Sequence, residues 1–130
     1  MLTLSHLNDQ HLFFVRVFEI SPIGMALLSF DGSYKVNPSL CKMLGYTESE
    51  LLNLSVPSVT HPEDLEADLE LWNKLAQGEI DGYQIEKRYI HKSGDIIWGL
   101  LNVTVERDKQ GNTVNDIYIS QVVNITDQKK

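Results

Sequence analysis

The sequence predicts a single α+β domain in which five antiparallel strands form one sheet, helices cover one face of the sheet, and a further helix flanks it at the N-terminus. The first supporting observation is the order of the expected elements, which is one helix, two strands, several helices and then three strands. The second is that short turn signals join the last three strands, as in an antiparallel meander. The third is that 130 residues, 42% of them hydrophobic, suit one packed domain and leave no room for two.

The N-terminal segment is expected to be a helix over about residues 8–20. Its apolar side chains recur at spacings of three and four, which is typical of an amphipathic helix; they are Leu12, Phe14, Val15 and Phe18. Ser21 precedes Pro22, and the residue before a proline avoids helical angles, so the helix should end there.

A β-hairpin is expected after this helix. Its strands cover residues 24–30 and 34–37. Asp31 and Gly32 lie between them and both tolerate positive φ, which is a strong signal for a tight turn.

Capping signals predict short helices in the middle of the chain. Asn37 is a good N-cap for a helix over residues 39–44, and Gly45 is a good left-handed C-cap for it. Thr47 and Glu50 have the spacing of a capping box, which starts another short helix.

Residues 55–60 are expected to be irregular, and a longer helix should follow them. His61 and Pro62 start this helix, and Gly78 ends it. An apolar stripe runs along it, made of Leu65, Leu69, Trp72, Leu75 and Ala76.

The last third of the chain is expected to be β structure. Three long strands cover residues 82–91, 96–107 and 113–125. Turn signals at residues 92–95 and 108–111 separate them, so neighbouring strands should be antiparallel. A polar, helix-permissive tail follows.

Several sequence blocks occur in an order that is specific, although each block alone is weak. The blocks are residues 21–26, Asp31-Gly32, Asn37 with Gly45-Tyr46, His61-Pro62-Glu63-Asp64, Glu86 and Arg88 with Ser93-Gly94 and Trp98, and Asn124-Ile125-Thr126 with Lys129. Together they resemble a PAS domain with its C-terminal PAC region, from about residue 18 to residue 130. The chain departs from the family pattern at Ser39, where alanine is usual, and at Ser93 and Asn124, where aspartate is usual.

The resemblance implies a five-stranded sheet, a helical cover and an internal cleft between them. It divides the chain into an N-terminal flanking helix (residues 1–20), a PAS/PAC domain (residues 21–126) and the start of an exit linker (residues 127–130) to a covalently attached effector. Such effectors are commonly histidine kinases or cyclic-di-GMP enzymes. The resemblance therefore implies a regulatory domain of a bacterial-type cytoplasmic signalling protein, and catalysis would lie in the effector.

Two functions remain open at this stage, and the first is sensing of a small ligand in the cleft. Apolar character and expected placement give the pocket candidates Met25, Leu27, Leu40, Leu44, Trp72, Ile85, Leu101 and Val103. The signal would leave through Asn124, Ile125 and Thr126. The second function is ligand-free homodimerisation or protein interaction, with Leu12, Phe14, Val15 and Phe18 of the N-terminal helix as dimer candidates. A small enzyme on this fold would need convergent ionisable groups, and the sequence shows no catalytic constellation.

The cofactor is unknown, and haem and flavin are both disfavoured. Cys41 lies outside the N-C-R-F motif of the flavin photoreceptors in this family. His61 lies at a helix start, where a structural role is favoured over haem ligation. His61, Asp64 and Asp68 share a helical face, which is expected to be solvated and to hold no metal.

The charge and the apolar pattern argue against two classes of partner, nucleic acids and membranes. The net charge of −7 disfavours binding to nucleic acid and to anionic membrane surfaces. The longest apolar runs have only a few residues, far fewer than the roughly 20 needed for a membrane span. We therefore expect no nucleic-acid partner and no membrane insertion of this segment.

Overall fold

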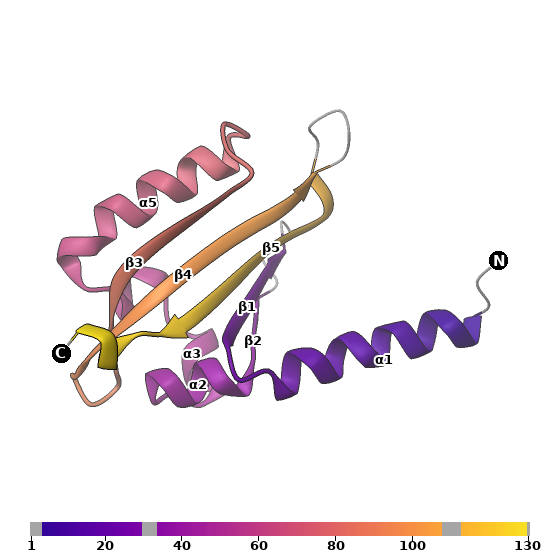
Figure 1. Cartoon of the computed structure of the whole chain (residues 1–130), viewed down its shortest axis with the longest axis horizontal. Helices are drawn as coiled ribbons and strands as arrows, with labels where there is room; N and C mark the ends of the chain where they lie inside the picture. Colours follow the sequence, from indigo (N-terminus) through magenta and orange to yellow (C-terminus); the bar gives the residue numbers. More distant parts are fainter. Residues whose placement is uncertain (1–3, 30–33, 108–112, 130) are drawn as a thin grey trace.

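The five strands form one antiparallel sheet. The computed structural model describes residues 4–29, 34–107 and 113–129, and in them the strands are β1 (Gly24–Ser29), β2 (Tyr34–Val36), β3 (Gly82–Ile90), β4 (Ile96–Arg107) and β5 (Thr113–Asn124). Their order in the sheet is β2-β1-β5-β4-β3, and every neighbouring pair is antiparallel (Figure 1). The predicted fold is confirmed: β5 joins the early hairpin to the late meander.

Among the described residues, one helix precedes the hairpin in the chain, and four lie between the hairpin and the meander. They are α1 (Leu4–Ile20), α2 (Pro38–Leu44), α3 (Glu48–Leu52), α4 (Val56–Val59) and α5 (Pro62–Ala76), followed at the C-terminal end by the 3-10 helix η1 (Thr126–Lys129). In Figure 1, α5 runs along β3, whereas α1 projects away from the sheet on the side opposite η1. Within the described residues, none of these helices combines the length and the apolar character needed to cross a membrane.

One sequence expectation about the middle of the chain is wrong. Residues 55–60 were expected to be irregular, but they contain α4, with Ser55 at its N-cap position and Pro57 in its first turn. A helix of one turn is too short to show a periodic pattern, so the sequence gives no sign of it. The turns expected at Asp31-Gly32 and at residues 108–111 lie outside the described residues.

The inner face of the sheet is defined by rows of paired residues. One row crosses four strands, because Ala26 pairs with Ser120, Ser120 with Val103, and Val103 with Tyr83. Side chains alternate between the two faces of a strand, so all four lie on the same face. Together with the helices, this face encloses a core that includes Leu44, Leu75 and Val103 as its least exposed side chains.

Asn37 ties three elements together at the start of the domain. Its side chain is fully buried, and its Oδ1 accepts hydrogen bonds from the backbone N–H of Leu40 at 3.0 Å and of Met25 at 2.8 Å. Its Nδ2 donates to the backbone oxygens of Phe18 at 3.0 Å and Ile23 at 2.9 Å. The sequence predicts the helix cap at Asn37, but the links to α1 and β1 emerge only from the structure.

Two glycines with positive φ provide a matched test of packing. Gly45 has φ 81° and a Cβ added there would collide with the ring of His91, whereas Gly94 has φ 96° and no neighbouring atom within 4 Å of an added Cβ. We expect Gly94→Ala to lower the free energy of unfolding by about 1 kcal/mol through backbone strain alone. Gly45→Ala should cost about 1 kcal/mol more, because the ring must also move. Urea unfolding of both variants checks this. Equal losses of unfolding free energy would show that the His91 ring can move aside at no cost.

Candidate functional site

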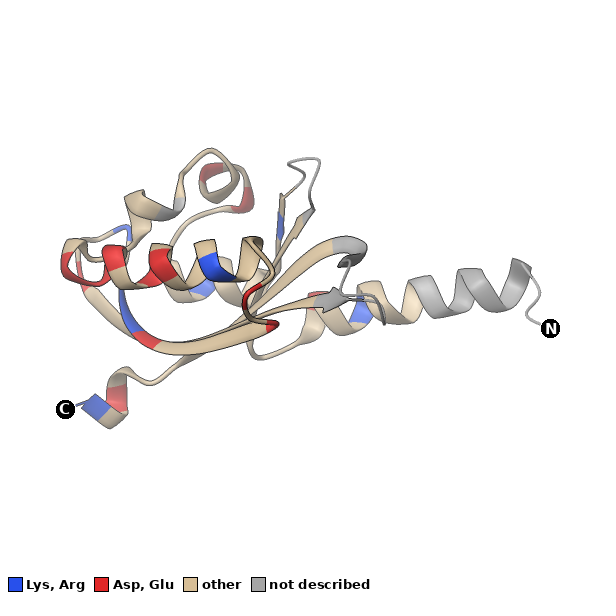
Figure 2. Cartoon of the chain, turned by 90° about the horizontal axis from the view of Figure 1, so that it is seen from above, with Lys and Arg blue, Asp and Glu red and all other residues tan. Residues whose placement is uncertain are grey.

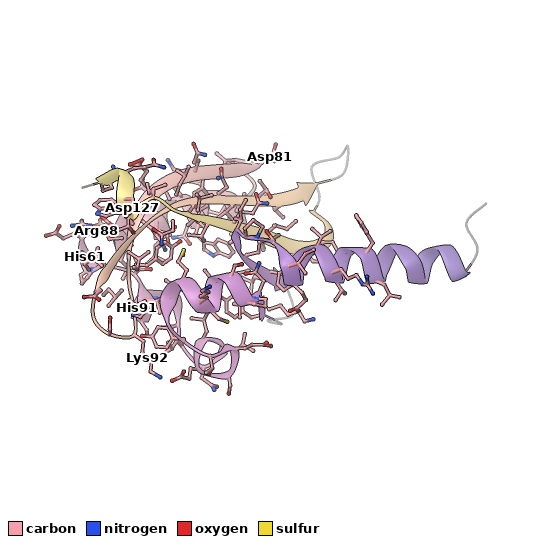
Figure 3. The ribbon with its side chains drawn as sticks, turned by 60° about the horizontal axis from the view of Figure 1, so that its bottom comes forward. His61, Asp81, Arg88, His91, Lys92 and Asp127 are labelled. Carbon is pink, nitrogen blue, oxygen red and sulfur yellow. The ribbon has the colours of Figure 1, made fainter. Side chains whose placement is uncertain are left out.

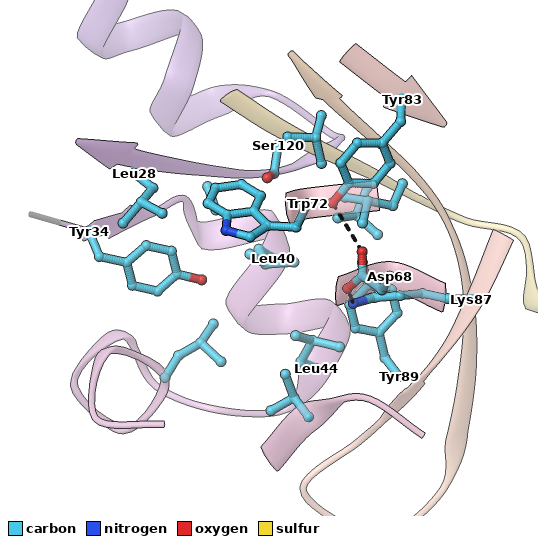
Figure 4. Close-up of a pocket in the computed structure, with 16 residues that line it drawn as sticks. Leu28, Tyr34, Leu40, Leu44, Asp68, Trp72, Tyr83, Lys87, Tyr89 and Ser120 are labelled. Atoms are coloured by element: carbon cyan, nitrogen blue, oxygen red, sulfur yellow. Dashed lines mark hydrogen bonds and ion pairs between the residues drawn. The ribbon is translucent and has the colours of Figure 1, made fainter. Parts of the chain in front are cut away.

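A cavity of about 260 Å³ lies between the inner face of the sheet and the helices (Figure 4). Its wall is mostly apolar, and a few polar side chains interrupt it. The residues that line it are Ala26, Leu28, Tyr34, Leu40, Leu44, Leu51, Val59, Asp68, Trp72, Tyr83, Lys87, Tyr89, Leu101, Val103, Ser120 and Val122. A concave, mainly apolar site with a few polar groups is the usual form of a small-molecule site.

The structure brings most of the predicted pocket residues into this wall. Those that line it are Leu40, Leu44, Trp72, Leu101 and Val103. The inclusion of Met25 and Leu27 is wrong: Ala26 and Leu28 line the cavity, and side chains alternate along β1.

Ile85 lies on the correct face of β3 but outside the cavity wall. It pairs with Leu101, which lines the cavity, and it is partly buried against the core. Its neighbours two residues away on the same strand, Tyr83 and Lys87, contribute to the wall in its place. The sequence therefore identified the face but not the position along the strand.

An ionic pair that the sequence did not predict forms the polar part of the wall. Lys87 Nζ donates to Asp68 Oδ2 at 2.6 Å and to Thr60 Oγ1 at 3.1 Å. Tyr83 Oη donates to Asp68 Oδ1 at 3.0 Å, and Lys87 Nζ lies 4.7 Å from the centre of the Tyr89 ring. Asp68 and Lys87 are 4% and 2% exposed, so the pair is shielded from water.

The expectation of a solvated face at Asp68 is wrong. Acidic residues dominate the first part of α5, as Figure 2 shows, and Glu66 and Glu70 are exposed as such residues usually are. Asp68 differs because it lies four residues before Trp72, on the helical face that covers the cavity. The spacing of four residues between Asp68 and Trp72 was the sequence signal that could have predicted the burial of Asp68.

The buried tyrosines stay protonated at neutral pH. Burial raises the pKa of Tyr83, and the nearby Asp68 carboxylate raises it further. Burial also raises the pKa of Tyr89 and of Tyr34. Their hydroxyl groups can therefore act as hydrogen-bond donors within the wall.

A second polar cluster lies on the outer face of the sheet and begins at Arg88. Its Nε and Nη2 donate to Asp64 Oδ2 and Oδ1, both at 2.9 Å, and its backbone N–H donates to Asp64 Oδ2 at 2.7 Å. Glu63 accepts a further bond from Nη2 at 3.0 Å. These contacts lower the pKa of the Asp64 carboxyl and raise that of the Arg88 guanidinium. The first turn of α5 is thereby fixed to β3.

Trp98 connects this cluster to the C-terminal exit. Two cations lie over its ring, with Arg88 Cζ 5.3 Å and Lys129 Nζ 4.9 Å from the ring centre. Lys129 also bonds Glu86 at 2.7 Å. Figure 3 shows Arg88 and Asp127 at the same end of the domain. Trp98 is thus absent from the cavity wall and contacts η1 on the outer face.

The predicted exit residues form a compact connection to β4. Ile125 is buried and its N–H donates to Trp98 O at 2.9 Å, while the Trp98 N–H donates to Thr126 Oγ1 at 3.0 Å. Asn124 Oδ1 accepts from Thr126 N at 3.0 Å and from its Oγ1 at 2.6 Å. The neutral amide at Asn124 therefore fills the role of a local cap. Its part in signalling stays a prediction.

The dimer candidates on α1 separate into exposed and buried residues. Leu12 and Phe14 are 57% and 50% exposed, and Val15 is half-buried. Phe18 is only 3% exposed, so its assignment to an interface is wrong. It lies in the last turn, where Asn37 bonds its carbonyl oxygen and holds the helix against the domain. The sequence missed Phe13 and Ile20, which are more exposed.

The residues considered for cofactors lie outside the cavity. Cys41 is half-buried on α2, and burial raises the pKa of its thiol. His61 caps α5, with its Nδ1 accepting from Glu63 N at 3.1 Å. Among the described residues, no three histidine, cysteine or acidic side chains are arranged to share a metal ion.

Comparison with known proteins identifies relatives among signalling proteins. The probable diguanylate cyclase DgcE of Escherichia coli (strain K12) is 38% identical to this chain over 126 residues, which are 96% of this chain and 11% of that protein. The sensor histidine kinase TmoS of Ectopseudomonas mendocina is 29% identical over 90 residues, which are 68% of this chain and 9% of that protein. The chain thus spans about a tenth of the length of these curated relatives.

The fold and the family agree with the resemblance inferred from the motifs. The crystal structure of the Rhodobacter sphaeroides LOV protein matches with a TM-score of 0.71 at 17% identity, and the match covers 91% of this chain and 68% of that one. The family model described as the PAS fold matches residues 34–119, which include α2 to α5 and most of the sheet. The chain therefore belongs to the PAS fold family.

Proposed function

We propose that this chain is the sensory module of a signalling protein, and that it binds a small ligand in its cavity and passes a conformational change to an attached effector. One observation carries the proposal: α5 lines the cavity and also holds Arg88, which contacts Trp98 beside the exit. Asp68 and Trp72 of this helix line the cavity, and Asp64 in its first turn holds Arg88, which contacts Trp98. A ligand that moves α5 against β3 would alter both sites.

The route requires a ligand that prefers one of two arrangements of α5. A ligand with equal affinity for both arrangements would shift nothing. Because Arg88 and Trp98 are paired in register on β3 and β4, a change at Asp64 reaches Trp98 across one strand. The backbone N–H of Trp98 in turn donates to Thr126 Oγ1, so the final step lies at η1.

The relatives support a cyclic-di-GMP enzyme as the effector. The match to the probable diguanylate cyclase extends over nearly the whole chain, whereas the match to the histidine kinase is shorter and less similar. A histidine kinase is therefore the second choice. Catalysis would lie in the effector, and the substrate of a nucleotide cyclase would place the module in the cytoplasm.

The cavity wall does not fit haem or a flavin that reacts with a thiol. Its described residues include neither histidine nor cysteine. Haem in sensors needs an axial side chain, and a flavin adduct needs a thiol. Lys87, the one cation among the described residues of the wall, is already paired with Asp68, so a flavin phosphate would also lack a partner there. We therefore propose a ligand of another kind.

The two tryptophans of the chain allow a direct test, because Trp72 lines the cavity and Trp98 contacts the exit. The indole N–H signals would be followed by ¹H–¹⁵N NMR while a library of neutral, anionic and cationic fragments is added. A bound fragment should shift Trp72 directly and Trp98 through α5. Shifts of Trp72 without Trp98 would contradict relay, and the absence of any Trp72 shift would contradict ligand sensing.

A matched pair of variants on α5 isolates the route. Asp64→Asn should keep the response of Trp72 and weaken that of Trp98, because it loses the ionic contact with Arg88. Glu70→Gln is the control. Glu70 is exposed, and its pair with Lys74 is a weak surface contact with an N–O distance of 3.9 Å. This control should leave both responses unchanged. Equal effects of the two substitutions would contradict the route.

Exposed side chains on α1 favour the alternative function, a ligand-free homodimerisation or protein-interaction module. Phe13 and Ile20 are 70% and 79% exposed, and Leu12 and Phe14 add further apolar surface. A monomer seldom exposes such a patch without a partner. Sedimentation velocity would distinguish the two functions: a tight dimer that binds no fragment supports the interaction module, and a monomer contradicts it.

A further inference from the structure

The cavity wall restricts the chemistry of the ligand, and the inference drawn from it rests on the proposed sensory function. The size of the cavity gives the first restriction. A protein cavity of about 150 Å³ holds benzene. A volume of about 260 Å³ scales to roughly ten non-hydrogen atoms, so one ring with a short substituent fits and a larger cofactor does not.

The second restriction is charge. Asp68 and Lys87 are the ionic residues of the wall among those described, and they neutralise each other at 2.6 Å. An ammonium group has three donors, and Lys87 directs two of them to Asp68 and Thr60 while lying over the Tyr89 ring. An anionic ligand would therefore have to compete with Asp68 and Thr60 for this ammonium group. Both oxygens of Asp68 are also engaged, so a cation would compete with Lys87 and Tyr83.

The third restriction comes from polar groups that remain available on another part of the wall. The Tyr34 hydroxyl, the Trp72 indole N–H and the Ser120 hydroxyl make no side-chain hydrogen bond with any residue that the structure describes. In Figure 4 the Tyr34 oxygen and the Trp72 nitrogen are turned toward the interior of the cavity. A ligand atom that accepts a hydrogen bond would satisfy these donors.

We propose that the cavity selects an uncharged ring compound of about ten non-hydrogen atoms that carries a hydrogen-bond acceptor. The acceptor binds the donors of Tyr34 and Trp72, and the ring packs against the aliphatic and aromatic wall. The Asp68–Lys87 pair, already engaged in its own contacts, excludes charged compounds of the same size.

Four probes of similar size separate these features: acetophenone, benzoate, phenethylamine and cumene. They represent a neutral ring with an acceptor, an anion, a cation and a hydrocarbon without an acceptor. Affinity is measured from the Trp72 indole N–H signal. We expect acetophenone to bind at least about tenfold more tightly than benzoate or phenethylamine, and several-fold more tightly than cumene.

The variant Tyr34→Phe tests the acceptor site, because it removes the hydroxyl and keeps the ring. It should lower the affinity for acetophenone toward that for cumene, because the Trp72 indole N–H is then the remaining donor of the pair, and it should leave the affinity for cumene unchanged. Tyr46→Phe is the matched control, since Tyr46 packs against the core outside the cavity wall, and it should change neither affinity.

Each outcome is decisive for the inference. Equal or tighter binding of benzoate or phenethylamine would overturn the exclusion of charge, and an unchanged preference for acetophenone in Tyr34→Phe would overturn the acceptor site. If no probe binds but a charged fragment of the library shifts Trp72, the inference fails while the sensory function stands. If nothing in the library shifts Trp72, the sensory function itself fails.

Discussion

Replacement of Asn37 by alanine is expected to lower the free energy of unfolding by about 4 kcal/mol. The substitution removes the N-cap of α2 and leaves the N–H groups of Met25 and Leu40 without their acceptor. It also leaves the carbonyl oxygens of Phe18 and Ile23 without their donor. A loss of this size is a large part of the 5–15 kcal/mol that stabilises a typical domain. Urea unfolding would show it as a lower midpoint with an unchanged slope.

Asn53→Ala is the control for this substitution. The Asn53 side chain also donates to a backbone oxygen, that of Ser49 at 2.8 Å, but it is exposed and water can replace the bond. Its loss should cost no more than about 0.5 kcal/mol. If Asn37→Ala cost as little as Asn53→Ala, Asn37 would not be the structural link between α1, β1 and α2.

The elements of this fold could be predicted wherever the signal lies within a few residues. The cap at Asn37, the capping box of Thr47 and Glu50, and the start of α5 at His61 all appear where the sequence places them. These features depend on hydrogen bonds between near neighbours, so the local sequence specifies them. The long strands β3, β4 and β5 were predictable for the same reason, because short turn signals in the sequence separate them.

The orientation of β1 could not be predicted in this way. Residues 25–28 are apolar without alternation, so the sequence does not show which face meets the helices. Pairing with β5 decides it, because Ala26 is placed opposite Ser120 on the cavity face. Met25 and Leu27 therefore point away from the candidate site, although they belong to the correct strand.

Contacts across long sequence separations account for the rest of the site. Asp68 and Lys87 lie 19 residues apart on different elements, and each alone looks like an exposed charged residue. Phe18 likewise looks like part of an exposed apolar face, and its burial depends on how α1 meets the domain. Both are tertiary effects that no window of sequence contains.

Removing either member of the Asp68–Lys87 pair is expected to destabilise the domain by about 3–5 kcal/mol, because the remaining charge would be buried without a partner. The single variants are Asp68→Leu and Lys87→Met, which keep the approximate shape of each side chain. The double variant should be more stable than either single variant, since no buried charge remains. Denaturant unfolding of the four proteins should give a coupling energy of at least about 2 kcal/mol.

The exposed pair of Glu86 and Lys129 shows why burial decides this outcome. Its N–O distance of 2.7 Å is almost the same as the 2.6 Å between Lys87 and Asp68, but its side chains are 48% and 35% exposed. Water screens such a pair, so the corresponding cycle should give no more than about 0.5 kcal/mol. Similar coupling energies for the two pairs would mean that water reaches Asp68 and Lys87. A large difference would mean that the cavity keeps its ionic pair dry, which is the condition under which the pair can reject charged ligands.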